Sequence, residues 1–199
     1  MIFYGDSNTY GYDPADLAEN RYPDADRWTT IVSKQLSENY QVFPEGLNGR
    51  QLPDLKYDQA YLMSLIEKAA DDGIFCTMLG TNDLLLTLQP DAARPIRKME
   101  AYLHFLKQYL RSEQIIVIAP PLIGSDTIQD AFYQRCFRES RKMNDGFLLL
   151  AEKTGVIFVD ASLWEIGVSF DHVHFSKAGH QKFASKIMEL IRSNVTWYL

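Results

Sequence analysis

The strongest constraint on this chain is the alternation of short apolar runs with longer amphipathic segments. Five runs read as strands, at residues 2–4, 41–44, 74–79, 115–119 and 156–159. Helical patterns stand between and after them, at about residues 26–36, 54–69, 91–111, 131–153 and 176–193. Strands that alternate with helices indicate βαβ units and a parallel sheet with right-handed crossovers. We therefore expect an α/β fold, a three-layer α/β/α (flavodoxin-like) arrangement around a five-stranded parallel sheet.

Local patterns refine this expectation. Residues 74–79 are apolar almost throughout, which favours a central strand covered on both faces. Pro44 should break the second strand. In the helix after Asp54, the apolar side is expected to comprise Tyr61, Leu62, Leu65, Ile66 and Ala69.

Size and charge narrow the function classes. The 199 residues, 46% hydrophobic and 23% charged, are typical of a globular protein, and we expect one domain over residues 1–199. A net charge of −6 disfavours nucleic acids and anionic membranes as partners. No apolar run approaches the ~20 residues that span a bilayer. Since the start shows no leader pattern, a cytoplasmic protein is the simplest interpretation, with a leader already removed as the alternative.

The cysteines point to no special chemistry. Cys76 and Cys136 are the only two, and they form no CxxC pair or His/Cys cluster. We expect two reduced, buried thiols and no metal site.

Polar residues gather where the strands end, which is where ligands bind in open parallel sheets. Ser7 follows the first strand in Gly5-Asp6-Ser7, and Asn82 follows the third in Gly80-Thr81-Asn82-Asp83. Gly49 lies in the loop after the second strand, where its backbone N–H is open to a ligand. Taken singly, the Ser7 and Asn82 segments are better explained as turns, and Gly49 can be an ordinary loop glycine.

An acid–base pair comes near the end of the chain. Asp171 and His174 are three residues apart before the last helix, so the carboxylate can orient the imidazole, which then serves as a base toward a serine. His172 and His180 compete for this role. His172 adjoins Asp171 and should point away from it, whereas His180 falls in the last helix, where packing is the expected role.

Together these segments resemble the blocks of the GDSL/SGNH hydrolase family. The resemblance runs from residue 3 to about 180. It implies a serine esterase with Ser7 as nucleophile, His174 as general base and then acid, and Asp171 as its orienting partner. It also implies an oxyanion hole made by the backbone N–H groups of Ser7 and Gly49 with the Asn82 side chain. No cofactor or metal is implied.

Further segments resemble the arylesterase-like branch of that family. They are Tyr10-Gly11-Tyr12-Asp13-Pro14, Arg27-Trp28 and Glu45-Gly46-Leu47, whereas residues 121–140 depart from it. Some members of the branch transfer acyl groups to other acceptors, and some are oligomers, so a homo-oligomer stays open. The expected pocket walls are apolar and aromatic: Tyr10, Tyr12, Leu85, Ile123, Trp164 and Phe170.

The substrate we expect is a small acyl or aryl carboxylic ester, including acetyl esters of carbohydrates. One alternative is a lysophospholipase, acyl-thioesterase or acyltransferase that uses the same triad. An alternative of another class is a non-catalytic binding module on the same fold. A nucleotide binder would share the strand pattern, but GxGxxG and GxxxxGK[ST] are both missing from the sequence.

Overall fold

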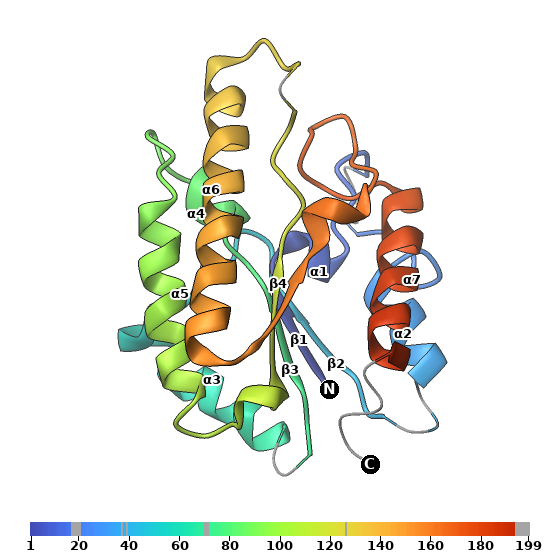
Figure 1. Ribbon diagram of the computed structural model, residues 1–199. Coiled ribbons are helices and arrows are strands. Elements are labelled where there is room, and N and C mark those ends of the chain that lie inside the picture. The colour runs from blue at the N-terminus through green and yellow to red at the C-terminus, as the bar shows by residue number, and fades with distance from the viewer. Residues whose placement is uncertain (17–20, 37, 39, 70–71, 126, 194–199) are drawn as a thin grey trace.

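The computed structural model describes residues 1–16, 21–36, 38, 40–69, 72–125 and 127–193 (Figure 1). Its centre is a five-stranded parallel sheet in the order β2-β1-β3-β4-β5. The strands are β1 (Ile2–Gly5), β2 (Phe43–Gly46), β3 (Phe75–Met78), β4 (Ile115–Ala119) and β5 (Ile157–Asp160). The expected five-stranded α/β fold is therefore confirmed.

Helices cover both faces of the sheet (Figure 1). One face carries α3 (Leu55–Lys68), α5 (Ala93–Leu106) and α6 (Ala131–Thr154), and the other carries α2 (Trp28–Leu36) and α7 (Lys177–Ser193). The short elements are α1 (Ser7–Tyr10), α4 (Thr81–Leu85) and two 3₁₀ turns, Ser112–Gln114 and Ala161–Trp164. Among the described residues, no helix is both long and apolar enough to cross a bilayer.

Successive side chains of the inner strands point alternately into two hydrophobic cores, one on each face of the sheet. In β4, Ile115 and Val117 join the core under α3, α5 and α6, whereas Ile116 and Ile118 join the core under α2 and α7. Side chains of a strand point alternately to opposite faces, so a strand covered on both sides must be apolar at every position. Cys76 and Cys136 are buried, unpaired thiols within these cores, as expected.

Two local expectations were wrong. The second strand runs through Pro44 to Gly46, because β2 is an edge strand and a proline there can present its missing N–H to the open side. Tyr61 points out of the core with 42% of its surface exposed. Its neighbours Leu62 and Leu65 fill the core, and the phenol hydroxyl finds a partner at the surface instead.

The segments after β1 and β3 form short helices, α1 and α4, where the sequence suggested turns. In the sheet, β2 lies on one side of β1, and β3, β4 and β5 follow on the other side. The direction in which strands are added therefore reverses at β1. Ligands in open α/β sheets bind at such a reversal, beyond the carboxyl ends of the strands. Both short helices begin at this edge.

Candidate active site

Ser7 is held at the edge of the sheet by a single-turn helix. The Asp6 carboxylate caps α1 by accepting a hydrogen bond from the Asn8 backbone N–H at 2.9 Å. Gly11 ends the turn in the left-handed conformation, and its N–H donates to the Ser7 carbonyl. Gly5 is needed at the entry, because a Cβ there would lie 2.0 Å from Thr9 Oγ1. The strand-to-helix turn thus fixes the direction of the Ser7 side chain.

Asp171 and His174 form a tight pair on the loop before α7. The His174 Nδ1 atom lies 2.6 Å from Asp171 Oδ2, while the backbone N–H groups of Val173 and His174 both donate to Oδ1. Burial alone raises the pKa of the Asp171 carboxyl, but these hydrogen bonds outweigh it and leave that pKa below its usual value. The carboxylate is therefore ionised at neutral pH, and it accepts a hydrogen bond from the Nδ1–H group of His174.

The other ring nitrogen faces the serine. His174 Nε2 lies 2.9 Å from Ser7 Oγ, within hydrogen-bonding distance. With Nδ1 protonated toward Asp171, Nε2 carries the lone pair and can take the proton of the hydroxyl. The structure therefore brings Ser7, His174 and Asp171 into one hydrogen-bonded chain, an arrangement that can make a serine nucleophilic.

The other two candidate bases lie elsewhere. His172 is exposed at the turn with a φ of 61°, and its backbone N–H donates to the Ser169 carbonyl. His180 is fully buried in α7, where its Nδ1 accepts from the Trp28 backbone N–H at 3.5 Å. Burial lowers the pKa of His180 to about 4, so its ring is neutral at physiological pH.

The three expected oxyanion donors, Ser7, Gly49 and Asn82, lie in the segments that follow β1, β2 and β3. Gly49 adopts a φ of 74°, and among the described residues its backbone N–H has no partner. Asn82 lies in the first turn of α4, and its Nδ2 donates to the Arg50 carbonyl at 3.1 Å. Because an amide nitrogen carries two hydrogens, this contact orients the side chain and leaves the second hydrogen for a ligand.

Sequence reasoning missed two neighbours of the triad. The Asn8 side chain donates to the Val173 carbonyl at 3.2 Å and accepts from the Phe175 backbone N–H at 2.8 Å, so it holds the loop on both sides of His174. The Tyr12 ring, which was expected only as a pocket wall, lies with its centroid 4.5 Å from that of the His174 ring. Neither contact has a local sequence signal, since the loop is more than 160 residues away.

Asp6 is a buried acid that directly precedes Ser7 in the chain. Burial raises its pKa to about 6, although the Asn8 N–H bond and the nearby His174 act in the opposite direction. Its carboxylate caps α1, so it supports the position of Ser7 from behind.

The expected pocket walls are scattered. Ile123 is 2% exposed, and Trp164 packs with its ring centroid 5.2 Å from that of Phe183, so both serve the cores. Phe170 is 71% exposed, and Tyr10 lies under the Arg21 guanidinium. Leu85 lines a shallow apolar hollow with Leu86, Leu88 and Phe132.

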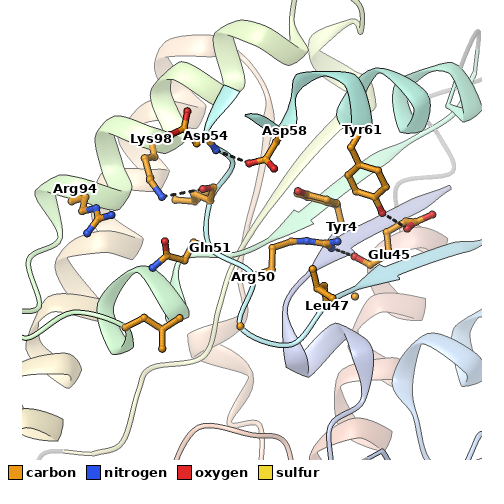
Figure 2. Close-up of a pocket in the computed structure, with 14 residues that line it drawn as sticks. Tyr4, Glu45, Leu47, Arg50, Gln51, Asp54, Asp58, Tyr61, Arg94 and Lys98 are labelled. Carbon is orange, nitrogen blue, oxygen red and sulfur yellow. Dashed lines mark hydrogen bonds between the residues drawn. The ribbon is translucent and has the colours of Figure 1, made fainter. Parts of the chain in front are cut away.

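A larger cavity of about 850 Å³ opens beside Gly49, and none of the six expected wall residues lines it (Figure 2). Its walls come from the loop after β2 and from α3 and α5, and they include Arg50, Tyr61 and Arg94. No group of three or more metal-ligating His, Cys, Asp or Glu side chains occurs in the part of the chain described.

The chain resembles known proteins in both sequence and fold. Residues 3–182 match the model of the GDSL-like lipase/acylhydrolase family. No curated protein matches the chain in sequence. Among solved structures, a carbohydrate acetylesterase from Sinorhizobium meliloti superimposes with a TM-score of 0.77 at 21% identity, over 96% of this chain and 97% of that one.

Two further structures share the fold. An aryl esterase from M. smegmatis gives a TM-score of 0.76 at 23% identity, covering 96% of this chain and 97% of that chain. A variant of an acetyl-xylooligosaccharide esterase from Geobacillus gives 0.68 at 22% identity, covering 96% and 92%. At these sequence identities the superpositions show only that the fold is shared. The match to the family model shows that the chain belongs to the family.

Proposed function

The chain belongs to the GDSL-like lipase/acylhydrolase family, and from that premise we propose that it hydrolyses small acyl or aryl carboxylic esters, including acetyl esters of carbohydrates, with Ser7 as nucleophile. The observation that carries the proposal is the chain of hydrogen bonds from Asp171 through His174 to Ser7, with distances of 2.6 and 2.9 Å. Geometry of this kind lets an imidazole activate a hydroxyl that is otherwise a weak nucleophile.

In the acylation step, His174 Nε2 takes the Ser7 proton while Oγ attacks the ester carbonyl. The carbonyl oxygen then becomes an oxyanion, which the backbone N–H groups of Ser7 and Gly49 and the second Asn82 Nδ2 hydrogen stabilise. Donors of this kind typically contribute ~100–1,000-fold each to kcat. As the tetrahedral intermediate collapses, the bond to the alcohol oxygen breaks, and His174 gives its proton to that oxygen. Ser7 is left acylated.

In the deacylation step, water replaces the alcohol. His174 takes one proton from the water as its oxygen attacks the acyl carbon, and the same oxyanion donors serve again. Collapse breaks the bond to Ser7 Oγ, which regains the proton, and the carboxylic acid leaves. The ionised Asp171 stabilises the imidazolium that forms in both steps.

The preference for esters without a long alkyl chain on either side rests on the surroundings of Gly49. The cavity there is lined by charged and phenolic side chains, which a long alkyl chain would have to desolvate. The apolar hollow around Leu86 and Leu88 is shallow and open, and Leu88 itself is 98% exposed.

Turnover of p-nitrophenyl acetate tests the proposal. The wild-type protein should hydrolyse it, and Ser7→Ala should lower kcat by roughly 10⁴-fold or more, because residual rates without the nucleophile come from binding and the oxyanion hole alone. Circular dichroism would check that the variant is folded. Retained activity in folded Ser7→Ala would refute the proposal.

A further inference from the structure

The cavity beside Gly49 has a composition that selects its ligand. We infer that it is the subsite for the alcohol part of the ester, and that it takes a neutral alcohol rich in hydroxyl groups, such as a sugar. This inference rests on the proposed esterase activity. At about 850 Å³ the cavity falls within the ~300–1,000 Å³ of typical small-molecule sites.

Gly49, one of the expected oxyanion donors, lines the cavity. Arg50 and Gln51 also line it (Figure 2), and both are hydrogen-bonded to Asn82, another of the expected donors. The Arg50 carbonyl accepts from Asn82 Nδ2, and Gln51 Nε2 donates to the Asn82 carbonyl at 3.2 Å. An ester whose carbonyl oxygen sits against Gly49 and Asn82 would therefore place one of its two substituents in this cavity.

Two of the three basic residues in the wall, Arg50 and Lys98, are fixed before any ligand arrives. Arg50 donates to the carbonyls of Gly5 and Glu45, and its guanidinium lies 4.3 Å from the centre of the Tyr4 ring. Lys98 donates to the buried Asp83 carboxylate at 2.9 Å and to the Leu52 carbonyl at 3.1 Å. The charge of Lys98 is neutralised by Asp83, and the guanidinium of Arg50 is hydrogen-bonded to backbone carbonyls. Neither cation therefore requires an anionic ligand.

The acidic residues are held in the same way. Glu45 accepts from the Tyr61 hydroxyl at 2.6 Å and pairs with Lys68, and Asp58 accepts from the Asp54 backbone N–H at 2.8 Å (Figure 2). Asp54 in turn caps α3 through Oδ1. Each carboxylate keeps oxygen lone pairs beyond these bonds, which can accept from hydroxyl groups.

The charges in the cavity wall balance, which favours a neutral ligand. Three acids and three bases line the cavity, namely Glu45, Asp54, Asp58, Arg50, Arg94 and Lys98. An anion would meet the three carboxylates and a cation the three bases. An aliphatic alcohol would desolvate all six without replacing their hydrogen bonds to water. A polyhydroxyl compound both donates and accepts, and its carbon skeleton can pack on the exposed Tyr61 ring.

Arg94 supplies an unused donor set. It stands one turn before Lys98 on α5 and lines the cavity (Figure 2). Within the described residues, no side-chain partner of its guanidinium is found, and five N–H groups are thus open to hydroxyl oxygens. Because Arg94 is exposed and its side chain supports no other element, its removal should leave the fold intact.

Two pairs of variants test the inference. The cavity variants are Arg94→Ala and Tyr61→Ala, and their matched controls are Arg97→Ala on the same helix α5 and Tyr57→Ala on the same helix α3. Arg97 and Tyr57 are exposed and do not line the cavity. For each protein, kcat/KM is measured with a monoacetylated methyl xyloside and with p-nitrophenyl acetate, which carry the same acyl group on different alcohols.

We expect each cavity variant to lower the ratio of the two kcat/KM values about tenfold, as for the loss of one hydrogen-bonding or packing partner. The controls should keep the wild-type ratio. A wild-type enzyme that cleaves p-nitrophenyl acetate but not the acetylated glycoside would overturn the subsite, as would cavity variants with an unchanged ratio. These outcomes differ from failure of the proposed esterase activity, in which Ser7→Ala would retain turnover of p-nitrophenyl acetate.

Discussion

Asn8 and Phe175, 167 positions apart in the sequence, are joined by a hydrogen bond of 2.8 Å from the Phe175 backbone N–H to Asn8 Oδ1. The Asn8 amide also donates to the Val173 carbonyl, so one side chain grips the residues on both sides of His174. Asn8 follows Ser7 directly. Ser7 and His174, the proposed nucleophile and its proposed base, are therefore positioned against each other by a residue that is expected to touch neither the substrate nor the transferred proton.

Replacement of Asn8 tests whether its two side-chain hydrogen bonds position His174. Asn8→Ala would leave the Phe175 N–H and the Val173 carbonyl unpaired, which typically costs ~1–3 kcal/mol. The loop would relax, and a displacement of ~1 Å can lower a rate about 100-fold. We expect kcat to fall 10- to 100-fold and KM to change little. Asn8→Asp should be as damaging, because a carboxylate would face the Val173 carbonyl. Unchanged kcat in both variants would exclude a positioning role.

The Tyr12 ring should stabilise the His174 imidazolium that forms during turnover. Their ring centroids lie 4.5 Å apart, within the ~6 Å range of cation–π contact. Tyr12→Leu should lower kcat/KM for p-nitrophenyl acetate about fivefold, which corresponds to about 1 kcal/mol. Tyr12→Phe keeps the ring and should retain most of the rate. If Phe and Leu behave alike, the aromatic face contributes nothing.

Gly46 allows β2 and α1 to approach closely. A Cβ at this position would lie 2.1 Å from the Tyr10 backbone nitrogen, which no side-chain movement can relieve. Gly46→Ala should therefore push α1 and Ser7 aside, lowering kcat more than tenfold and the free energy of unfolding by ~1–3 kcal/mol. Gly146→Ala is the control, since the atoms nearest its Cβ all belong to the Ile96 side chain and none to the backbone. Full activity in Gly46→Ala would contradict this packing argument.

His180 should make the protein less stable in acid. Burial lowers the pKa of His180 to about 4 in the folded state, against an ordinary value of 6.5. The unfolded chain then binds more protons between pH 6.5 and 4, so the free energy of unfolding falls by ~3 kcal/mol as the pH drops through that window. Arg27 adds to the lowering of the pKa, and Asp26 opposes it.

Urea unfolding of the wild-type protein and His180→Gln at pH 7 and pH 4 measures this effect. The variant should lose about 3 kcal/mol less on acidification. Asp6, whose pKa is raised to about 6, has the opposite linkage: its contribution is favourable at low pH and is lost as the pH rises from 3.8 to 6. Because Asp6 is present in both proteins, its effect cancels in the comparison. Equal losses would show that His180 is not buried as a neutral ring.

The sheet could be predicted from the sequence, and so could the polar residues that follow its strands, because both depend on local patterns. The apolar run at residues 74–79 sets a central strand, and Gly5 and Gly80 mark where the chain turns. In a parallel sheet every such end faces the same edge, so Ser7 and Asn82 were expected together. The catalytic roles of these residues remain predictions.

The surroundings of the site could not be predicted, since they depend on packing between distant segments. Tyr61 belongs to a helical stripe whose spacing predicts an inward position, yet its hydroxyl donates to the Glu45 carboxylate in β2. Ile123 and Trp164 looked like pocket walls but pack into the cores. The polar cavity arises only when α3, α5 and the loop at Gly49 come together.

Ser7 is the proposed nucleophile, and covalent labelling tests this role most directly. Wild-type protein is treated with a fluorophosphonate and digested, and the modified peptide is identified by mass spectrometry. We predict a single adduct on Ser7, formed with loss of activity and absent from Ser7→Ala. An active wild-type enzyme that carries no adduct, or one labelled at another residue as its activity is lost, would contradict the account.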